Sequence, residues 1–182
     1  MTKKVDRELK GKLVYLRRPE PKDEAEFVAN AQRSQNFHRG LFRMARSRDE
    51  FAAFIERTHS SSTAGFVLSR IDDDKIVGVI SLSQIFYGPL KSAYLGYGLF
   101  ADFTGRGYAT DAVRLIVRYA FNELKLHRIE ANIQPNNTAS IKLVARLGFS
   151  KEGFSPKYLK IGGRWRDHER WALIRENWNK NL

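Results

Sequence analysis

The fold is decided by Leu95-Gly-Tyr-Gly-Leu-Phe-Ala-Asp-Phe-Thr-Gly-Arg-Gly-Tyr-Ala-Thr-Asp-Ala-Val-Arg114. This stretch predicts a strand over residues 93–100, a glycine-containing turn, and a helix with apolar residues at helical spacing from Arg106 to Leu124. Gly105 and Gly107 keep bulky side chains away from the head of that helix, where free backbone amides and the helix dipole favour an anion. We therefore predict a phosphate group at this turn, although Gly-x-Gly alone fits a simple flexible helix start equally well.

The turn differs from two familiar phosphate-binding motifs. It lacks the pattern Gly-x-x-x-x-Gly-Lys-Ser/Thr of the nucleoside-triphosphate P-loop. No Gly-x-Gly-x-x-Gly run opens the helix, because Gly96 and Gly98 lie inside the preceding strand. The sequence thus argues against both a P-loop protein and a dinucleotide-binding fold.

Length and composition predict one globular domain. The chain has 182 residues, 42% hydrophobic and 29% charged, which suits a single soluble core. It has no apolar run of transmembrane length, and its first residues lack the apolar core of a signal peptide. With no cysteine, disulfides, thiolate metal ligands and thiol nucleophiles are excluded, and the four scattered histidines suggest no metal site. We expect a cytoplasmic protein without membrane association.

The formal net charge is +12, with lysine and arginine spread along the chain. A solvated basic surface, attraction to an anionic ligand, and binding to RNA would each explain this charge. Composition does not separate the three.

The order of the other patterns predicts an α+β domain around one mixed, mostly antiparallel sheet flanked by helices. The phosphate-type turn lies at the carboxyl end of a central strand, where ligands gather in such sheets. A capping box at Ser47 and Glu50 predicts a helix start, and Asp72–Asp74 predicts a hairpin turn. We expect a basic tail over residues 1–10, the domain over 11–177 and a short tail over 178–182. The expected strands cover 13–18, 66–71, 76–85, 93–100 and 129–133 with a β-rich region from 149 to 178, and the expected helices follow residues 23, 47, 106 and 137.

Four blocks, in order and at the right spacing, resemble the GCN5-related N-acetyltransferases (GNAT). They are Leu95–Thr110, His127–Ser140, Leu143–Phe149, and Phe149–Phe154 with Gly162–His168. The resemblance covers roughly residues 11–177 and is closest to the RimJ/RimL-type branch, which acetylates the N-terminal alanine of ribosomal proteins. It implies a single GNAT-type domain in which a splayed strand pair holds acetyl-CoA.

The resemblance also implies the residues that hold this cosubstrate. The end of the splayed strand would bind the pantetheine arm, and the turn at the helix head would bind the pyrophosphate through backbone amides. Family members usually open the turn with glutamine or arginine, whereas this chain has Thr104. Asn137 would contact the cofactor arm and fits a helix N-cap as well. The full set is Leu99, Phe100, Ala101, Thr104, Gly105, Arg106, Gly107, Tyr108, Ala109, Thr110 and Asn137.

For catalysis, the resemblance implies that Ser140 protonates the departing CoA thiolate. Other acetyltransferases use a tyrosine for this step, at a position where this chain has Val144. In part of the branch a glutamate acts as general base, and its position corresponds to Leu159 here. Other carboxylates of the chain are therefore the alternative candidates for the general base. An N-terminal α-amine has a pKa of about 7.7–8.0, against about 10.4 for the lysine side chain. A part of the α-amine is therefore already neutral at neutral pH, so its attack depends less on a general base. The alternative carboxylates are Glu130, Glu152, Asp167 and Glu169.

We thus predict an acetyl-CoA-dependent N-acetyltransferase in which the amine attacks the thioester directly, without a covalent enzyme intermediate. The expected acceptor is the α-amine of an alanine-initial protein, ribosomal or other, with Phe37–Phe42 as one wall of its site. Alternatives are a small amine such as a polyamine or aminoglycoside, and a non-catalytic module that associates with RNA or the ribosome. The chain would be a monomer or a homodimer, and its basic surface would suit an RNA-containing assembly better than a free basic protein.

Overall fold

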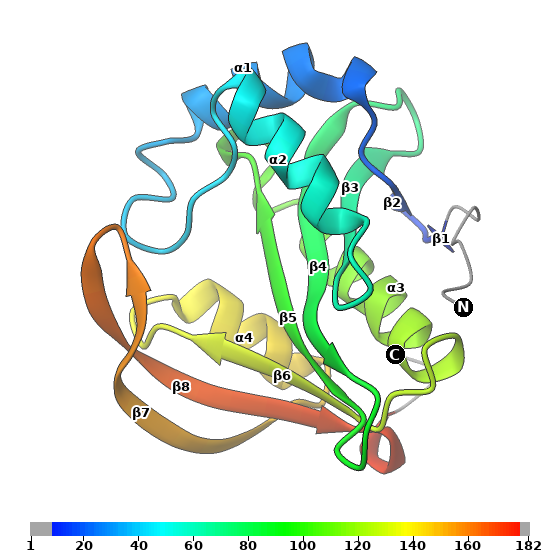
Figure 1. Cartoon of the computed structure of the whole chain (residues 1–182), viewed down its shortest axis with the longest axis vertical. Coiled ribbons are helices and arrows are strands. Elements are labelled where there is room, and N and C mark those ends of the chain that lie inside the picture. Colours follow the sequence, from blue (N-terminus) through cyan, green and yellow to red (C-terminus); the bar gives the residue numbers. More distant parts are fainter. Residues whose placement is uncertain (1–8, 179–182) are drawn as a thin grey trace.

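A computed structural model describes residues 9–178, which form one eight-stranded sheet with helices on both faces (Figure 1). The strand order is β1-β2-β3-β4-β5-β6-β8-β7, and every neighbouring pair is antiparallel except β5–β6. This confirms the predicted α+β fold with a mixed, mostly antiparallel sheet. The strands are β1 (Leu9–Lys10), β2 (Val14–Arg17), β3 (Ala64–Arg70), β4 (Ile76–Phe86), β5 (Ser92–Leu99), β6 (Arg128–Ile133), β7 (Ser150–Ile161) and β8 (Arg164–Ile174).

Four α-helices cover the sheet. They are α1 (Glu24–Arg33), α2 (Arg48–Thr58), α3 (Tyr108–Asn122) and α4 (Thr138–Arg146), with short 3-10 turns at Pro21–Asp23, Ala101–Phe103 and Arg175–Asn177. Of the predicted tails, residues 1–8 and 179–182 lie outside the described residues; Leu9–Lys10 pair with β2, and Trp178 packs against Phe121. Within the described residues, no helix is both long and apolar enough to span a bilayer.

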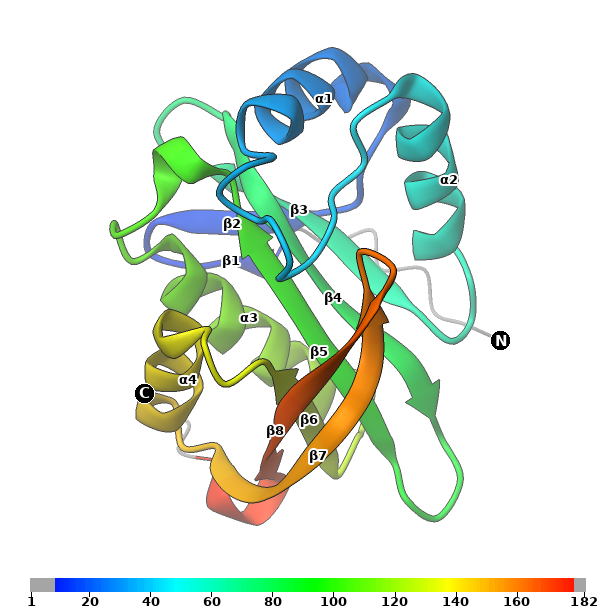
Figure 2. The same cartoon turned by 90° about the vertical axis from the view of Figure 1, so that its left-hand side faces the viewer.

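The core has two parts, one on each face of the sheet. The larger part lies under α3 and α4, where Val113, Ile116 and Val117 of α3 are almost fully buried. The smaller part lies under α1 and α2 around Phe27 and Phe51. Figure 2 shows α1 and α2 on one side of the sheet and α3 with α4 on the other.

The strands β5 and β6 pair over only three residues and then diverge. Ser92, Ala93 and Tyr94 are matched with Arg128, Ile129 and Glu130, and no ladder pair follows them toward the ends of the two strands (Figure 1). This is the splayed strand pair that the resemblance implied. Since β5 continues to pair with β4 as far as Leu99, the divergence opens a gap in the middle of the sheet rather than at its edge.

A buried carboxylate joins the N-terminal strands to α3. Oδ2 of Asp111, in the first turn of α3, accepts hydrogen bonds from the backbone amides of Lys12, Leu13 and Val14 at 2.9, 2.7 and 3.1 Å. Gly11 is required at this turn, because a Cβ there would lie 2.4 Å from the same oxygen. Sequence analysis missed this anchor, which connects residues almost a hundred positions apart.

The helix starts show where local sequence rules hold. Asn137 Oδ1 accepts from the amide of Ser140 at 3.3 Å, which confirms the N-cap of α4. Ser47 Oγ accepts from the amide of Glu50 at 3.2 Å and caps α2. The Glu50 carboxylate, however, accepts from the amide of Arg46 instead of Ser47, so only half of the predicted capping box forms.

Candidate active site

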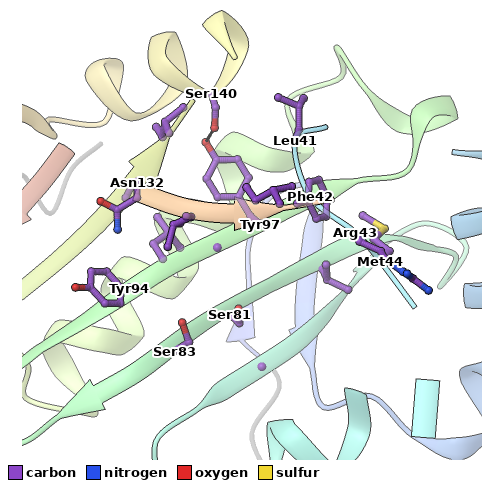
Figure 3. A pocket seen from close by; sticks show the side chains of 18 of the residues that line it. Leu41, Phe42, Arg43, Met44, Ser81, Ser83, Tyr94, Tyr97, Asn132 and Ser140 are labelled. Carbon is purple, nitrogen blue, oxygen red and sulfur yellow. Dashed lines mark hydrogen bonds between the residues drawn. The ribbon is translucent and has the colours of Figure 1, made fainter. Parts of the chain in front are cut away.

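A cavity of about 720 Å³ lies at the divergence of β5 and β6 (Figure 3). Its walls come from β4, β5 and β6, from the start of α4, from the β7–β8 hairpin, and from α2 and the loop that precedes it. The cavity therefore lies where the fold leaves two neighbouring strands unpaired.

The cavity communicates with both faces of the sheet. Leu95 and Tyr97 pack with the larger core under α3 and α4, so the alternation of side chains directs Tyr94 to the opposite face. On β6, Ala131 and Ile133 belong to the larger core, and Asn132 between them faces the same way as Tyr94. A thioester held between the strands could thus be approached from either side of the sheet.

The end of β5 presents backbone groups to the gap. The amide of Phe100 donates to Val77 O of β4 at 2.9 Å, so alternation along the ladder turns the polar groups of Tyr97 and Leu99 away from β4. Leu99 O already accepts from His38 Nε2 at 2.7 Å, and the amide of Ala101 donates to Ser34 Oγ at 2.9 Å. Among the three predicted pantetheine contacts, the amide of Leu99 faces the gap, whereas those of Phe100 and Ala101 have protein partners.

The turn before α3 has the features of an anion site. Gly105 and Gly107 have φ of 74° and 85°, a region that favours glycine, and a Cβ on Gly105 would meet no heavy atom within 4 Å. The first amide that bonds back into the helix is Asp111 N, to Gly107 O, so the amides of Arg106 to Thr110 are the free donors of the helix head. These features fit the pyrophosphate of acetyl-CoA, and the residues of the turn stay a prediction.

The threonines at the two ends of the turn are partly engaged. Thr104 Oγ1 donates to Ala101 O at 3.0 Å, and Thr110 Oγ1 accepts from Arg146 Nη2 at 3.0 Å. Both donors of Thr104 are thus used within the turn, because its backbone amide also donates to Ala101 O, at 3.3 Å. Arg106 is exposed, as are Gly105 and Gly107, so the turn is open to a ligand.

Replacing Gly107 with valine should abolish measurable binding of acetyl-CoA. A β-branched residue at a φ of 85° is strained by about 1–2 kcal/mol, and its side chain would crowd Leu13, 3.2 Å from the Cβ position. Isothermal titration with acetyl-CoA measures the loss. Gly163→Val is the matched control, because Gly163 has a φ of 80° in the distant β7–β8 turn and should leave the affinity unchanged. Unaltered affinity in Gly107→Val would remove the turn from the binding site.

Ser140 meets a partner that sequence analysis did not assign. Its Oγ lies 2.6 Å from the hydroxyl of Tyr97, and both side chains line the cavity (Figure 3). Burial raises the pKa of the Tyr97 hydroxyl, so Tyr97 stays protonated at neutral pH. Val144, in the position of the usual family tyrosine, is fully buried in the core. Tyr97 thus brings a tyrosine hydroxyl to Ser140 from β5 instead of from α4.

The carboxylates named as alternative bases are occupied elsewhere. Glu130 and Glu152 pair with Arg128, Glu169 pairs with Lys151, and Asp167 accepts from the amide of Lys157. No aspartate or glutamate lines the cavity in the part of the chain that the structure describes, whereas Leu159 does. The site therefore contains no carboxylate positioned to take a proton from an incoming amine.

The predicted acceptor wall closes over the gap between the two strands. Gln134 directly follows β6, and its Nε2 donates to Gly40 O at 2.7 Å and to Leu41 O at 3.2 Å, which ties the loop to the end of β6. Phe42 packs on Gly98 of β5, where a Cβ would lie 1.8 Å from its ring. Leu41 and Phe42 line the cavity, whereas Phe37 is 54% exposed and does not.

Comparisons with known proteins agree with this geometry. Residues 14–150 match the family described as Acetyltransferase (GNAT) domain. The Probable N-acetyltransferase YjcK of Bacillus subtilis (strain 168) is 38% identical over 175 residues, 91% of this chain and 96% of the relative. The ribosomal protein uS5-alanine N-acetyltransferase of Escherichia coli (strain K12) is 40% identical over 125 residues, 68% of this chain and 64% of that enzyme.

A solved structure gives the same result. Mycobacterium smegmatis RimJ in complex with CoA-disulfide superposes with a TM-score of 0.84 at 28% identity, covering 90% of this chain and 82% of that chain. The family match, the relatives and the splayed sheet are mutually consistent. The chain therefore belongs to the GNAT family, in its RimJ/RimL-type branch, and is an acetyl-CoA-dependent N-acetyltransferase.

Proposed function

We propose that this enzyme acetylates the N-terminal α-amine of a protein that begins with alanine, with Ser140 protonating the CoA thiolate and Tyr97 supporting Ser140. The observation that carries the proposal is the 2.6 Å contact between Ser140 Oγ and the Tyr97 hydroxyl at the gap between β5 and β6. A similar relative, the Escherichia coli enzyme, acts on the alanine of ribosomal protein uS5, which supports the choice of acceptor.

The proposed transfer needs only groups that lie at the gap. The amine nitrogen bonds to the acetyl carbon as the carbon–sulfur bond breaks, and the amide of Leu99 donates to the thioester oxygen as it gains charge. Ser140 gives its hydroxyl proton to the leaving sulfur and regains one from Tyr97, which exchanges with solvent. The surplus proton of the amine leaves to water. The phosphate-binding turn at the start of α3 would hold the other end of acetyl-CoA.

The lining of the cavity favours an α-amine over a polycation. Its described charged residues are Arg43 and Arg57, which would repel a polyamine, and a polyamine would need carboxylates that the lining lacks. An α-amine, with a pKa of about 7.7–8.0, is partly neutral at pH 7.5 and can attack without a strong base.

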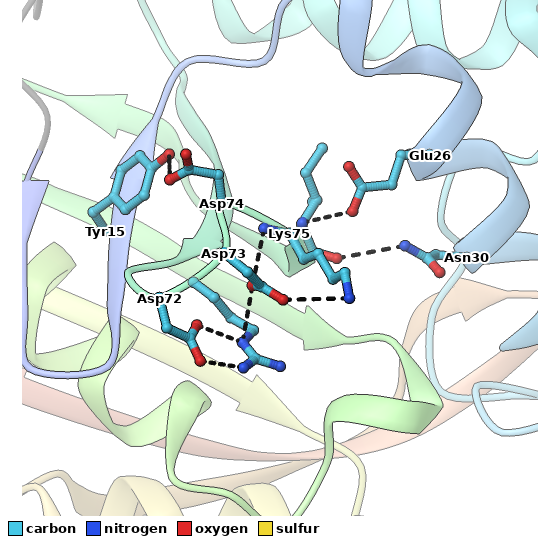
Figure 4. A network of polar contacts seen from close by, with 9 residues as sticks. Tyr15, Glu26, Asn30, Asp72, Asp73, Asp74 and Lys75 are labelled. Carbon is cyan, nitrogen blue, oxygen red and sulfur yellow. Dashed lines mark hydrogen bonds and ion pairs between the residues drawn. The ribbon is translucent and has the colours of Figure 1, made fainter.

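The acidic turn between β3 and β4 does not provide free carboxylates that could bind a polyamine. Arg70 bonds to Asp72 and lowers the pKa of that carboxyl to about 2, and Asp73 contacts both Arg70 and Lys75 at 3.2 and 3.3 Å (Figure 4). Asp74 accepts from the Tyr15 hydroxyl at 3.0 Å. Asp72 and Asp73 thus bond within the hairpin and Asp74 bonds to β2, which agrees with the hairpin turn expected from the sequence.

A free-thiol assay with acetyl-CoA tests the proposal directly. Peptides that are identical except for a first residue of alanine, serine, glycine or leucine are compared with an N-terminally blocked peptide containing lysine, and with spermidine. We expect release of CoA with the alanine peptide and at least tenfold less with the blocked peptide and spermidine. Equal or faster release with spermidine, or with the blocked peptide, would reject an α-amine acceptor.

A further inference from the structure

His168 has a ring nitrogen that no group of the described residues engages. Its Nδ1 lies 2.9 Å from the carbonyl oxygen of Arg166, which can only accept a hydrogen bond, so Nδ1 carries the hydrogen of the neutral ring. Nε2 is therefore left with a lone pair. His168 lines the cavity, although only 2% of it is exposed, and Nε2 is not one of the fully enclosed polar atoms that lack a partner. The lone pair of Nε2 thus opens to the cavity.

His168 lies on the face of the sheet opposite Tyr97. The ladder between β6 and β8 pairs Asn132 with the residue two positions after His168, so the side chains of Asn132 and His168 point to the same face. Tyr94 faces this side as well. If Ser140 and Tyr97 serve the sulfur of the thioester from the other face, the amine reaches the carbonyl carbon from the side of His168.

His168 also lies at the correct end of the cavity. The ladder between β6 and β8 runs as far as Ile133, the last residue of β6, which places His168 beside the end of that strand. Because β5 and β6 are parallel, Leu99 at the end of β5 lies at the same edge of the gap. The amide of Leu99 is the proposed donor to the thioester oxygen. The ring of Tyr158 packs edge-on against His168 at 6.0 Å and holds it from the side of β7.

The imidazole is the one group of the described lining that takes up a proton near neutral pH. No carboxylate lines the cavity, and arginine and tyrosine ordinarily keep their protons in this range. Amide and hydroxyl oxygens, such as those of Gln134 and Ser81, bind an N–H without removing its proton. A histidine with a free lone pair removes it. The other titratable residues of the described lining are Arg43, Arg57, Tyr94, Tyr97 and Tyr158.

We propose that Nε2 of His168 accepts, directly or across one water, the proton that the amine loses during the transfer. The amine nitrogen bonds to the acetyl carbon and gives up this proton, while the electron pair of the carbon–sulfur bond goes to the sulfur, which Ser140 protonates. The imidazolium then returns its proton to solvent. The inference rests on the acyl transfer proposed above and gives the surplus proton of the amine a destination within the enzyme.

The pH dependence of two variants tests this assignment. His168→Gln and His168→Asn keep a neutral polar side chain that cannot act as a base. With kcat/KM expressed per neutral amine, both should be about 10- to 100-fold below wild type at pH 8. The deficit should narrow toward pH 5.5, because the imidazole of the wild type is then itself protonated and no longer accepts a proton. The Kd for acetyl-CoA, from isothermal titration, should stay within twofold.

Other groups near His168 do not produce the same difference between wild type and variants. His38 lies outside the lining, burial lowers its pKa, and it is present in wild type and variants alike, so its titration cancels in the comparison. The charged and phenolic groups that face His168 from β6, β7 and β8 are of types that ordinarily titrate outside pH 5.5–8. They are Glu130 with its partner Arg128, Tyr158, Arg166 and Arg170.

The same substitution at a distant histidine is the matched control. His127 precedes β6 at the end away from the gap, is 48% exposed and contacts Glu176. His127→Gln should stay within twofold of wild type at every pH, since an exposed ion pair contributes little.

Three results would overturn the assignment. A deficit of equal size at every pH would show that His168 acts only by supporting the structure. Variants within twofold of wild type at pH 8 would show that the amine loses its proton elsewhere. If neither variant binds acetyl-CoA, the wild type decides alone: its kcat/KM per neutral amine should fall from pH 8 to pH 5.5, and a constant value would reject the base.

The design separates this inference from the choice of acceptor. Wild-type enzyme is first assayed with the alanine peptide and with spermidine, and that comparison alone decides the proposed α-amine function. The His168 variants are then compared on whichever amine turns over faster. Rejection of the alanine peptide would leave the test of His168 complete, because every amine loses a proton when it becomes an amide.

Discussion

Replacing Asp111 with alanine should lower the free energy of unfolding by about 3–5 kcal/mol, a large share of a typical domain's stability. The reason is that one buried oxygen accepts three backbone amides, those of Lys12, Leu13 and Val14. Without the carboxylate these amides lose their shared acceptor, and burial keeps water from replacing it for Val14. Thermal unfolding should show a midpoint roughly 6–20 °C lower.

Two further variants give this prediction its controls. Asp111→Asn keeps an oxygen of the same reach but loses the charge, so it should fall between wild type and alanine. Asp102→Ala removes a carboxylate that is 71% exposed and only 3.9 Å from Arg33, and it should leave the midpoint within about 2 °C. If Asp111→Ala had the same unfolding midpoint as Asp102→Ala, the Asp111 carboxylate would not contribute to stability.

Replacing Ser140 with alanine should lower kcat about 100-fold at pH 7, because general acid catalysis of this kind contributes 10²–10⁴. The KM for acetyl-CoA should change little, since the hydroxyl acts on the sulfur only as it departs. The deficit should narrow above about pH 8.5, where a thiol of ordinary pKa leaves as a stable thiolate without a proton. Initial rates of CoA release between pH 6 and 9.5 measure both effects.

Two further hydroxyl variants test whether the loss of kcat is specific to Ser140. Tyr97→Phe removes the partner 2.6 Å from Ser140 Oγ and should lower kcat less than Ser140→Ala does, because Ser140 can also exchange its proton with water. Ser83→Ala removes a hydroxyl that lines the cavity from β4, on the other face of the sheet, and should leave kcat unchanged. Turnover by Ser140→Ala within twofold of wild type would show that the sulfur needs no proton from Ser140.

The sequence predicted the parts of the fold that depend on neighbouring residues. The strand–turn–helix from Leu95 to Arg114, the hairpin at Asp72–Asp74 and the Asn137 cap each follow from spacing and turn chemistry over a few positions. The resemblance supplied the splayed strands, which the pairing of β5 with β6 confirms.

The parts that the sequence did not reveal depend on contacts across the fold. Tyr97 meets Ser140 from 43 residues away, and the amides that bond to Asp111 lie 97–99 residues from it. Tyr97 stood among several aromatic residues, and nothing in its neighbourhood along the chain distinguishes it. Alternation along β5 places Leu95, Tyr97 and Leu99 on the face of α3, but it does not identify Ser140 as the partner of Tyr97.

The divergence of β5 from β6 also bears on aggregation. Unpaired strand edges are templates for strands of other chains, and proteins normally protect them at the rim of a sheet. Here the two open edges face one another in the interior of the molecule, with α4 on one side and the loop held by Gln134 on the other. The unpaired backbone groups of β5 and β6 are thus accessible to a narrow extended ligand, whereas a strand of another chain cannot pair with them.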